Sequence, residues 1–328
     1  MPLNFNNNSI TSLNFNGNPV TALNYNGVEV WSSAPEPFYI KNRDNSNSIT
    51  VTITKNASAP SVSLEYSLDK DTWAPLTIGT AITVPADGKI YYRAPQGITN
   101  LAFGKMSAKS HFINSSGPID CGGDITTLLS KDGGITDLTG YSNYTFSDLF
   151  YNSGSQASNT LVDASKLILT PTTGLTNSCY YNLFNHQTNL IAGPQIPQIA
   201  VANQYTFGGT FTSCTSLTHL PANLFNIPVV DEYTYVNICL YCSSLEEVEL
   251  FSTQTPPYRC YRSAFSNCSS LNSVKVHFTS FGDAEGTGNW LNNVAQSGTF
   301  YCPSALGNDS TISRGVDYCP TNWTLINI

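Results

Sequence analysis

Apolar residues in the C-terminal half of the chain recur in a unit that repeats at a nearly constant interval. The clearest copies are residues 211–217, 239–245 and 265–271, with a more divergent copy at 184–190 and an older one that begins at Phe150. An aromatic residue also stands four positions before each copy, at Phe146, Tyr180, Phe207, Tyr235 and Tyr261. Self-similarity with a period of about 27 residues is typical of a solenoid, in which successive copies stack.

The spacing within one unit predicts its local structure. In the last copy the apolar positions are Tyr261, Phe265, Cys268 and Leu271. Their spacing of three and four residues predicts one face of a short helix. The segments 245–250 and 271–276 alternate apolar and polar residues, which predicts a brief strand. One unit is therefore predicted to be a short helix, a bend and a strand, with its apolar side chains buried between neighbouring copies.

The pattern of these copies resembles a known repeat family. Tyr-x-x-x-Phe-x-x-Cys-x-Ser-Leu, followed by Leu-x-x-Val-x-Leu, is similar to the BspA-like leucine-rich repeats of gut bacteria and their phages. The resemblance implies an α/β leucine-rich-repeat solenoid over residues 141–277, closed by a C-terminal cap over 278–328. The chain departs from the family pattern at Cys239, which stands in place of Phe, and at an insertion over 153–160.

Residues 1–33 carry a second, shorter repeat. The sequence Leu-Asn-aromatic-Asn occurs at 3–6, 13–16 and 23–26, and Asn-Gly dipeptides stand at Asn16-Gly17 and Asn26-Gly27. Both residues of such a dipeptide tolerate positive φ, so they predict tight turns between β-strands. This segment is therefore predicted to form β-hairpins, which are too small to bury a core of their own.

The end of the hairpin segment, residues 26–31, resembles the N-terminal segments of many phage tail and virion-appendage proteins. The resemblance implies that residues 1–33 attach the chain to other virion proteins. The side chains expected to make this contact are Phe5, Phe15, Tyr25 and Trp31. The alternative is an ordinary β-meander that stabilises the neighbouring domain.

Residues 37–103 alternate apolar and polar side chains in several short segments. The clearest are 48–54, 62–66, 82–84 and 90–93, and turn sequences occupy 69–71 and 86–88. Together they predict a small immunoglobulin-like β-sandwich. Asp69 and Asp71 suggest a calcium site as an alternative, but two acidic residues without further aligned oxygen ligands favour a solvated turn.

Residues 104–140 are interrupted by glycine. Gly117 and the pairs Gly122-Gly123 and Gly133-Gly134 break any long element. The resemblance to the BspA-like family implies that this segment is a connector and N-terminal cap of the repeats. A short strand is predicted at 125–129.

Composition narrows the range of functions. The chain of 328 residues has 22 acidic and 14 basic side chains, a net charge of −8, and only 11% charged residues. Nucleic-acid binding needs a dense basic face, so no nucleic-acid partner is predicted. No stretch reaches the ~18 apolar residues of a membrane-spanning helix, and the first residues lack the basic start and apolar run of a signal peptide. A surface-type composition without an export signal fits a phage protein, which leaves the cell by lysis.

Nine cysteines suggest metal or disulfide chemistry. Cys239 and Cys242 form the best zinc fragment, but no second Cys-x-x-Cys or His pair follows. Cys242 also shares its unit position with Cys214 and Cys268, which indicates core packing rather than a metal site. An odd number of cysteines and a cytoplasmic assembly route favour reduced thiols over a disulfide in the C-terminal cap.

No enzyme activity, cofactor or metal is predicted. Four histidines, none beside a nucleophile motif, give no support for a hydrolase triad. Gly208-Gly209 lacks the Lys-Ser/Thr of a phosphate-binding loop. Glu246, Glu247 and Glu249 alternate around a predicted strand, and the two that point outward are interpreted as solvated. A pair of distant catalytic carboxylates stays open as an alternative.

The exposed faces of the predicted solenoid carry Tyr, Asn, Ser, Thr and His rather than charge. Rings stack on apolar faces while amides form hydrogen bonds, so this chemistry suits contacts with sugars or proteins. The candidate binding residues are Tyr181, Tyr233 and Tyr258. For each of them the alternative is packing or capping of a repeat.

These patterns and resemblances together favour a phage virion appendage protein. Its hairpin segment would contact other virion proteins, and its repeats would bind a glycan or protein on the host surface, with a homo-oligomer compatible with this role. One alternative is a purely structural virion protein whose repeats bind neighbouring subunits. The other is a BspA-like adhesin on the bacterial cell surface.

Overall fold

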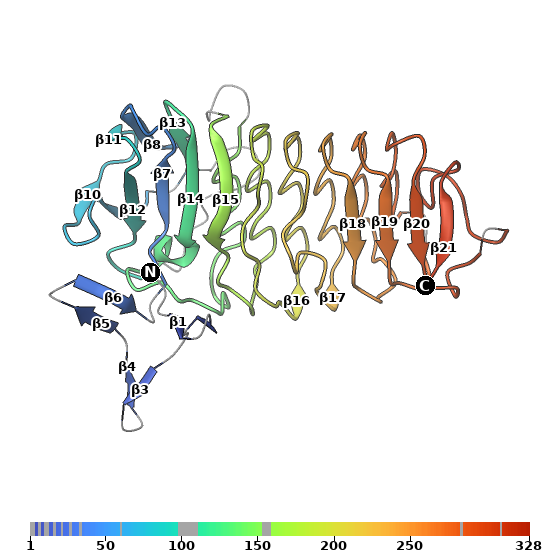
Figure 1. Ribbon diagram of the computed structural model, residues 1–328, viewed down its shortest axis with the longest axis horizontal. Coiled ribbons are helices and arrows are strands. Elements are labelled where there is room, and N and C mark those ends of the chain that lie inside the picture. The colour runs from blue at the N-terminus through green and yellow to red at the C-terminus, as the bar shows by residue number, and fades with distance from the viewer. Residues whose placement is uncertain are drawn as a thin grey trace.

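The computed structural model describes residues 35–59, 61–97, 111–152, 159–282, 285–308 and 310–328, and the strand backbones within 4–32. Strands and turns dominate this part of the chain, and its one helix is the short 3-10 helix η1 (Ile125–Leu128). Within the same residues, no helix is long and apolar enough to cross a membrane. From residue 35 onward the described chain is elongated, with largely antiparallel sheets at one end and parallel coils running to the C-terminus (Figure 1).

Antiparallel strand pairs occupy the N-terminal segment. The strands are β1 (Asn4–Phe5), β2 (Asn8–Ser9), β3 (Leu13–Phe15), β4 (Asn18–Val20), β5 (Ala22–Tyr25) and β6 (Val28–Ser32), paired in sequence order. Phe15 pairs with Asn18 and Tyr25 pairs with Val28, so each Asn-Gly dipeptide separates two paired residues and the predicted hairpins are confirmed. The side chains of the predicted docking residues Phe5, Phe15, Tyr25 and Trp31 lie outside what the structure describes.

The following strands form two sheets. They are β7 (Tyr39–Asn42), β8 (Ile49–Lys55), β9 (Leu64–Ser67), β10 (Ala74–Leu76), β11 (Ile82–Val84), β12 (Lys89–Arg93), β13 (His111–Ser115), β14 (Ile119–Asp124) and β15 (Leu161–Ile168). One sheet has the order β10-β9-β12-β7-β14-β15 and the other the order β11-β8-β13. The strands predicted within 37–103 are confirmed, and β8 alternates in burial as expected. Because β14 and β15 come from outside 37–103 and pair in parallel, the topology does not confirm an immunoglobulin-like sandwich.

The strand predicted at 125–129 is wrong, because this segment forms η1. The Asp124 carboxylate caps the helix by accepting hydrogen bonds from the backbone N–H and the hydroxyl of Thr126, at 2.9 and 2.8 Å. Such a cap satisfies a free donor at a helix start and favours the helix over a strand. The turn predicted at 69–71 is confirmed, since the Asp69 carboxylate accepts the backbone N–H groups of Asp71 and Thr72.

Parallel strands continue through the later coils of a β-solenoid. They are β16 (Val201–Ala202), β17 (Val229–Val230), β18 (Glu247–Leu250), β19 (Ser273–Val276), β20 (Thr299–Cys302) and β21 (Thr324–Asn327). β16 pairs with β17, and β18 to β21 form one four-stranded parallel sheet. The strands predicted at 245–250 and 271–276 are confirmed as β18 and β19. The segment predicted as a closing cap adds β20 and β21 to the same sheet.

Each described coil also contains a turn segment, a name used here for residues 142–152, 176–187, 203–214, 231–242, 257–268 and 285–293. Backbone N–H groups of a turn segment alternate between two kinds of acceptor. Cys179 N donates to Thr176 O of its own coil at 3.2 Å, whereas Tyr180 N donates to Thr206 O of the next coil at 2.9 Å. The same alternation recurs from coil to coil, so overlapping turns satisfy the backbone without a helix.

The short helix predicted in each unit is therefore wrong for the described coils. Residues with positive φ recur at every fourth position of a turn segment, as at Ser178 (59°), Asn182 (55°) and His186 (63°), which an α-helix does not tolerate. A conformation that repeats every four residues also places i and i+4 on the same face. The spacing of Tyr261 and Phe265 fits both structures, so the pattern alone did not separate them.

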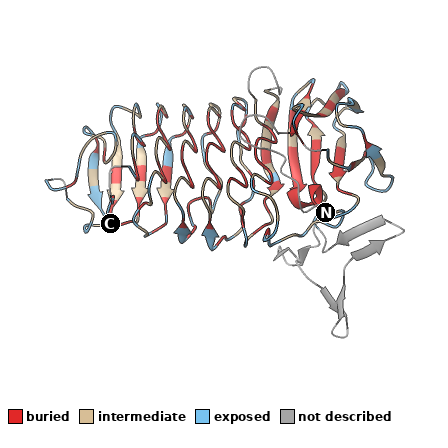
Figure 2. Cartoon of the chain, turned by 180° about the vertical axis from the view of Figure 1, so that it is seen from behind, coloured by how far each residue is buried: buried red, intermediate tan, exposed pale blue. Residues whose placement is uncertain are grey.

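The solenoid core contains a ladder of stacked aromatic rings. Adjacent centroids lie 5.9, 5.5, 6.0 and 5.4 Å apart along the series Phe146, Tyr180, Phe207, Tyr235 and Tyr261. These five buried side chains are the residues that precede each copy of the unit by four positions. Phe150 likewise stacks on Phe184 at 5.6 Å, so the alignment of copies is confirmed. Figure 2 shows that buried residues occur in the sheets of the N-terminal part and in each of the coils that follow.

Cys239, which stands where other copies have Phe, interrupts a second series of stacked rings. That series includes Phe184 and Phe211, whose centroids are 5.6 Å apart. Phe225 packs beside the interruption, 4.9 Å from the ring of Tyr235 and 5.8 Å from the ring of Phe265. Because Phe225 is only 5% exposed, it fills core space from the bend of the preceding coil.

The cysteines that share a unit position also share a hydrogen bond. The Sγ atoms of Cys214, Cys242 and Cys268 lie 3.3, 3.0 and 3.0 Å from a carbonyl oxygen of the preceding coil. Gln187 holds the same position in an earlier coil, and its amide donates to Phe150 O at 2.7 Å. The position therefore requires a buried donor, and all nine cysteines of the chain are buried and free of disulfides.

Candidate binding surface

Tyrosines occupy unusual backbone positions on the turn segments. Gly209, Asn237 and Asn267 hold positive-φ positions, which their residue types adopt at low cost. Equivalent positions are also held by Tyr144, Tyr205, Tyr233 and Tyr241, with φ of 65°, 56°, 59° and 66°. The left-handed conformation costs an ordinary residue about 1–2 kcal/mol. Positive φ recurs throughout the turn segments, so strain alone does not identify a site. Tyr205 and Tyr233 become candidates for binding because their rings also stack on each other.

The three predicted binding residues lie together in what we call the tyrosine row: Tyr181, Tyr205, Tyr233 and Tyr258. The row takes one residue from each of four turn segments that follow one another along the solenoid. Tyr205 and Tyr233 stack with centroids 4.6 Å apart and ring planes 13° from parallel. Tyr181 meets Tyr205 edge-on at 6.0 Å, and Tyr258 meets Tyr233 edge-on at 5.6 Å. Each ring thus restrains the next while the row stays accessible to solvent.

Tyr205 is not among the binding residues predicted from the sequence, although its position relative to the core aromatic ladder indicates it. Tyr144, Tyr205 and Tyr233 each stand two residues before a member of the core aromatic ladder. In a turn segment this offset is a positive-φ position. The positions of Tyr205 and Tyr233 can be predicted from the sequence only once the four-residue period of the turns is known.

Arg259 closes one end of the tyrosine row. Its guanidinium lies 4.7 Å from the ring centroid of Tyr258, and its Nε donates to the Glu285 carboxylate at 2.8 Å. This hydrogen bond holds the pKa of Glu285 below its ordinary value. Burial raises the pKa of Tyr181 and that of Tyr205, so both phenols are neutral at physiological pH. A neutral phenol both donates and accepts hydrogen bonds.

Amide side chains add directional hydrogen bonding to the turn segments. Asn185 Nδ2 donates to Asn182 Oδ1 at 2.9 Å, and Asn293 Nδ2 donates to Asn267 Oδ1 at 2.9 Å. These contacts fix the amides of Asn182 and Asn267, which are partly exposed, while Asn185 itself is buried. Rigid rings combined with ordered amides form a surface suited to sugars or to protein side chains.

The described residues bring no metal-binding cluster to this surface. Among them, no group of three or more His, Cys, Asp or Glu side chains is placed to hold a metal ion. Burial raises the pKa of the Cys214 and Cys268 thiols well above its ordinary value. Both side chains therefore stay in the unreactive thiol form.

Comparison with protein-family models, with characterised proteins and with solved structures finds no match for this chain. Similarity therefore assigns neither a family nor an activity. What the protein binds must be inferred from its own surface, where the tyrosine row combines strained backbone with ordered rings.

Proposed function

We propose that this chain is a non-enzymatic recognition protein of a phage particle, and that its tyrosine row binds a glycan or protein on the host surface. The main support is the stacked pair Tyr205 and Tyr233, flanked edge-on by Tyr181 and Tyr258. Tyr205 and Tyr233 also hold positive-φ positions, which are costly for tyrosine.

Preordered tyrosines are efficient binding groups. A phenol ring supplies a large contact area with few rotatable bonds, so little conformational entropy is lost when a ligand binds. In the tyrosine row the contacts between neighbouring rings remove part of that freedom beforehand. The phenol hydroxyls then add hydrogen bonds that select among ligands.

The solenoid presents this surface as an extended strip. Repeat proteins offer long surfaces because each coil adds one copy of the same position. Many copies of the chain on one particle would multiply a weak single contact into strong attachment, since later contacts form at high effective concentration. A modest affinity of one tyrosine row is therefore sufficient for the proposed role.

The N-terminal hairpins supply the attachment to the particle in this proposal. Their described strands pair as two-stranded units, and two-stranded hairpins need a neighbour to be stable. Their sequence resemblance to virion-appendage segments supports a virion protein as that neighbour. We also propose that the coils are related to BspA-like leucine-rich repeats. The sheets that precede them are proposed to be related to immunoglobulin-like domains.

Particles carrying altered copies of the protein test the two roles separately. Removal of residues 2–31 should leave a folded protein that is absent from purified particles on a blot. Tyr205→Asn combined with Tyr233→Asn should leave incorporation intact and reduce adsorption to host cells. Normal incorporation after the deletion would refute the docking role. Loss of assembly in the tyrosine variant would favour a structural virion protein whose coils bind neighbouring subunits.

A further inference from the structure

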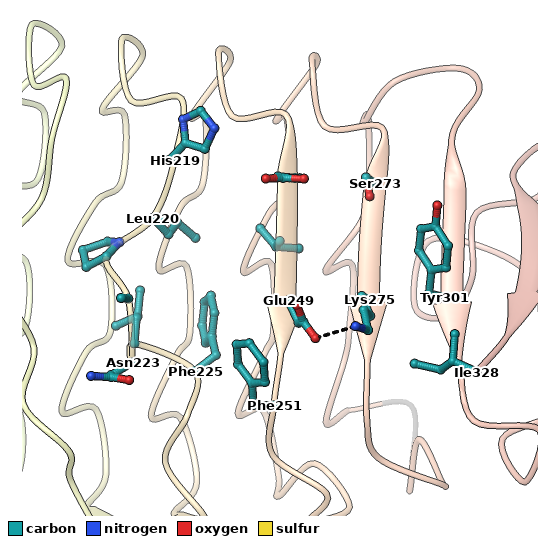
Figure 3. A pocket seen from close by; sticks show the side chains of 15 residues that line it. His219, Leu220, Asn223, Phe225, Glu249, Phe251, Ser273, Lys275, Tyr301 and Ile328 are labelled. Carbon is teal, nitrogen blue, oxygen red and sulfur yellow. Dashed lines mark ion pairs between the residues drawn. The ribbon is translucent and has the colours of Figure 1, made fainter.

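A groove lies on the outer face of the β18–β21 sheet, beside the coil that precedes β18. Pro221 lacks a backbone N–H, so this part of the coil cannot donate to a sheet ladder, and residues 219–225 run beside β18 as a bend. The bend and the sheet enclose a space of about 520 Å³. Figure 3 shows His219 and Asn223 on the bend, and the Asn223 amide points away from the strands and donates to Ile196 O at 3.1 Å.

The floor of the groove is polar. Cα register places Glu249 beside Lys275 and Lys275 beside Tyr301. Glu249 Oε1 accepts from Lys275 Nζ at 2.8 Å and contacts His277 Nε2 at 2.8 Å. Burial acts to raise the pKa of Glu249, but the hydrogen bonds from Lys275 and His277 outweigh it and the pKa is lowered. Glu249 is therefore a fixed, ionised acceptor and unsuited to act as a proton donor.

Two aromatic rings flank this polar floor. Phe251 is 47% exposed, yet its ring is held parallel to that of His277, with centroids 5.7 Å apart and planes at 11°. Tyr301, on β20, is partly exposed on the far side of Lys275. Figure 3 shows both rings beside the Glu249–Lys275 pair. An exposed ring held in place by a neighbour is a platform on which a flat apolar surface can stack.

The net charge of the groove limits which ligands it can bind. Glu247 lines the groove on the same strand as Glu249 and has no ion-pair partner among the described residues. Glu247, Glu249 and Lys275 together leave an excess of one negative charge. An acidic ligand would be repelled. A neutral ligand rich in hydroxyl groups could donate to both carboxylates.

We propose that this groove is a binding site for a neutral oligosaccharide. The rings of Phe251 and Tyr301 stack on the apolar faces of sugar rings, and the carboxylates of Glu247 and Glu249 accept sugar hydroxyls. The volume lies within the range of small-ligand sites in proteins. None of the tyrosine-row residues lines the groove, so this site is independent of the function proposed above.

Titration of the full chain with neutral trisaccharides tests the site. We expect maltotriose, cellotriose or chitotriose to give saturable heat in calorimetry, and 3′-sialyllactose, which carries a carboxylate, to bind at least about tenfold more weakly. Glu247→Gln and Phe251→Ala should each weaken the binding of the trisaccharide about tenfold. Glu246→Gln is the matched control, because Glu246 is exposed on the same coil and does not line the groove.

Two results would overturn the site. One is that no neutral trisaccharide binds, and the other is that binding is equal in the wild type, Glu247→Gln and Phe251→Ala. The variant Tyr205→Asn/Tyr233→Asn should bind the trisaccharide as the wild type does. This outcome separates failure of the groove from failure of the tyrosine row.

Discussion

The rings of Tyr205 and Tyr233 lie on adjacent coils, stacked with centroids 4.6 Å apart, and both residues have positive φ. A stack of this kind is worth about 0.5–1.5 kcal/mol. Two left-handed tyrosines cost about 1–2 kcal/mol each. The specific ring–ring term alone is therefore smaller than the strain of the two backbones, and burial of the two rings against each other contributes the rest. Asn or Gly would avoid this strain at both positions, so we interpret the retained pair of rings as a surface for a ligand.

Tyr241→Asn should stabilise the protein. Tyr241 is 52% exposed and has a φ of 66°, a conformation that Asn adopts more readily than Tyr. We expect the free energy of unfolding to rise by roughly 1 kcal/mol in urea titration. Tyr258→Asn is the control, because Tyr258 is exposed without a positive φ and should give no gain. A destabilised Tyr241→Asn variant would show that the tyrosine is not strained.

Cys242 should stabilise the fold both by donating a hydrogen bond and by packing in the core. Cys242→Ala removes the Sγ contact to Phe211 O and leaves a cavity, so we expect a loss of ~1–2 kcal/mol in the free energy of unfolding. Cys242→Val fills the volume without a donor and should still cost roughly 1 kcal/mol. Zinc analysis of both proteins is the second readout. Stoichiometric zinc that is lost on mutation would contradict the core assignment.

Phe225 and Cys239 should be energetically coupled. Phe225→Ala empties a buried position and should cost about 3–5 kcal/mol. Cys239→Phe alone should cost about 1–3 kcal/mol by overpacking against Phe225. If Phe225 fills the space beside Cys239, the double variant should be more stable than the sum of the single effects predicts. A double-mutant cycle in urea measures this coupling, and strict additivity would show that the two sites are independent.

Glu249 should give the sheet a pH-dependent contribution to stability. Its pKa is lowered below 4.5 because hydrogen bonds from Lys275 and His277 outweigh its burial. A depressed pKa stabilises the fold above the unfolded value and loses that effect as pH falls through the folded value. The difference in unfolding free energy between wild type and Glu249→Gln should therefore be present at pH 6 and shrink below 4.5. A difference that stays constant across this range would contradict the ion pair.

The repeat register could be predicted from sequence, because stacked coils place equivalent side chains in contact. Phe146 and Tyr180 were aligned correctly for this reason, and their rings are 5.9 Å apart. Hairpins could also be predicted, since Asn16-Gly17 dictates a local turn. The turn segments could not be predicted, because residues i and i+4 lie on the same face both in a helix and in turns that repeat every four residues. Because helices were predicted in place of turns, Tyr205 was not identified. Its outward direction depends on a positive φ, which the spacing of apolar residues does not indicate.

The groove over β18–β21 could not be predicted from the sequence pattern either. Glu247 and Glu249 were recognised as outward strand residues, but the contact of Glu249 with His277 depends on the parallel register between strands. Phe251 follows the strand directly in sequence, and the repeat pattern assigns it no role. Phe251 is 47% exposed and lines the groove together with Pro221 of the neighbouring coil.

Binding of the labelled full chain to host cells is the most direct test of the tyrosine row. Flow cytometry should compare the wild type with Tyr205→Asn/Tyr233→Asn and with the matched control Tyr241→Asn, which changes the same residue type in the same backbone conformation. Removing both rings should lower cell binding at least about tenfold, since each buried ring contact contributes about 1 kcal/mol or more. The control should bind as the wild type does. Undiminished binding by a folded Tyr205→Asn/Tyr233→Asn protein would contradict the proposal that this surface recognises the host.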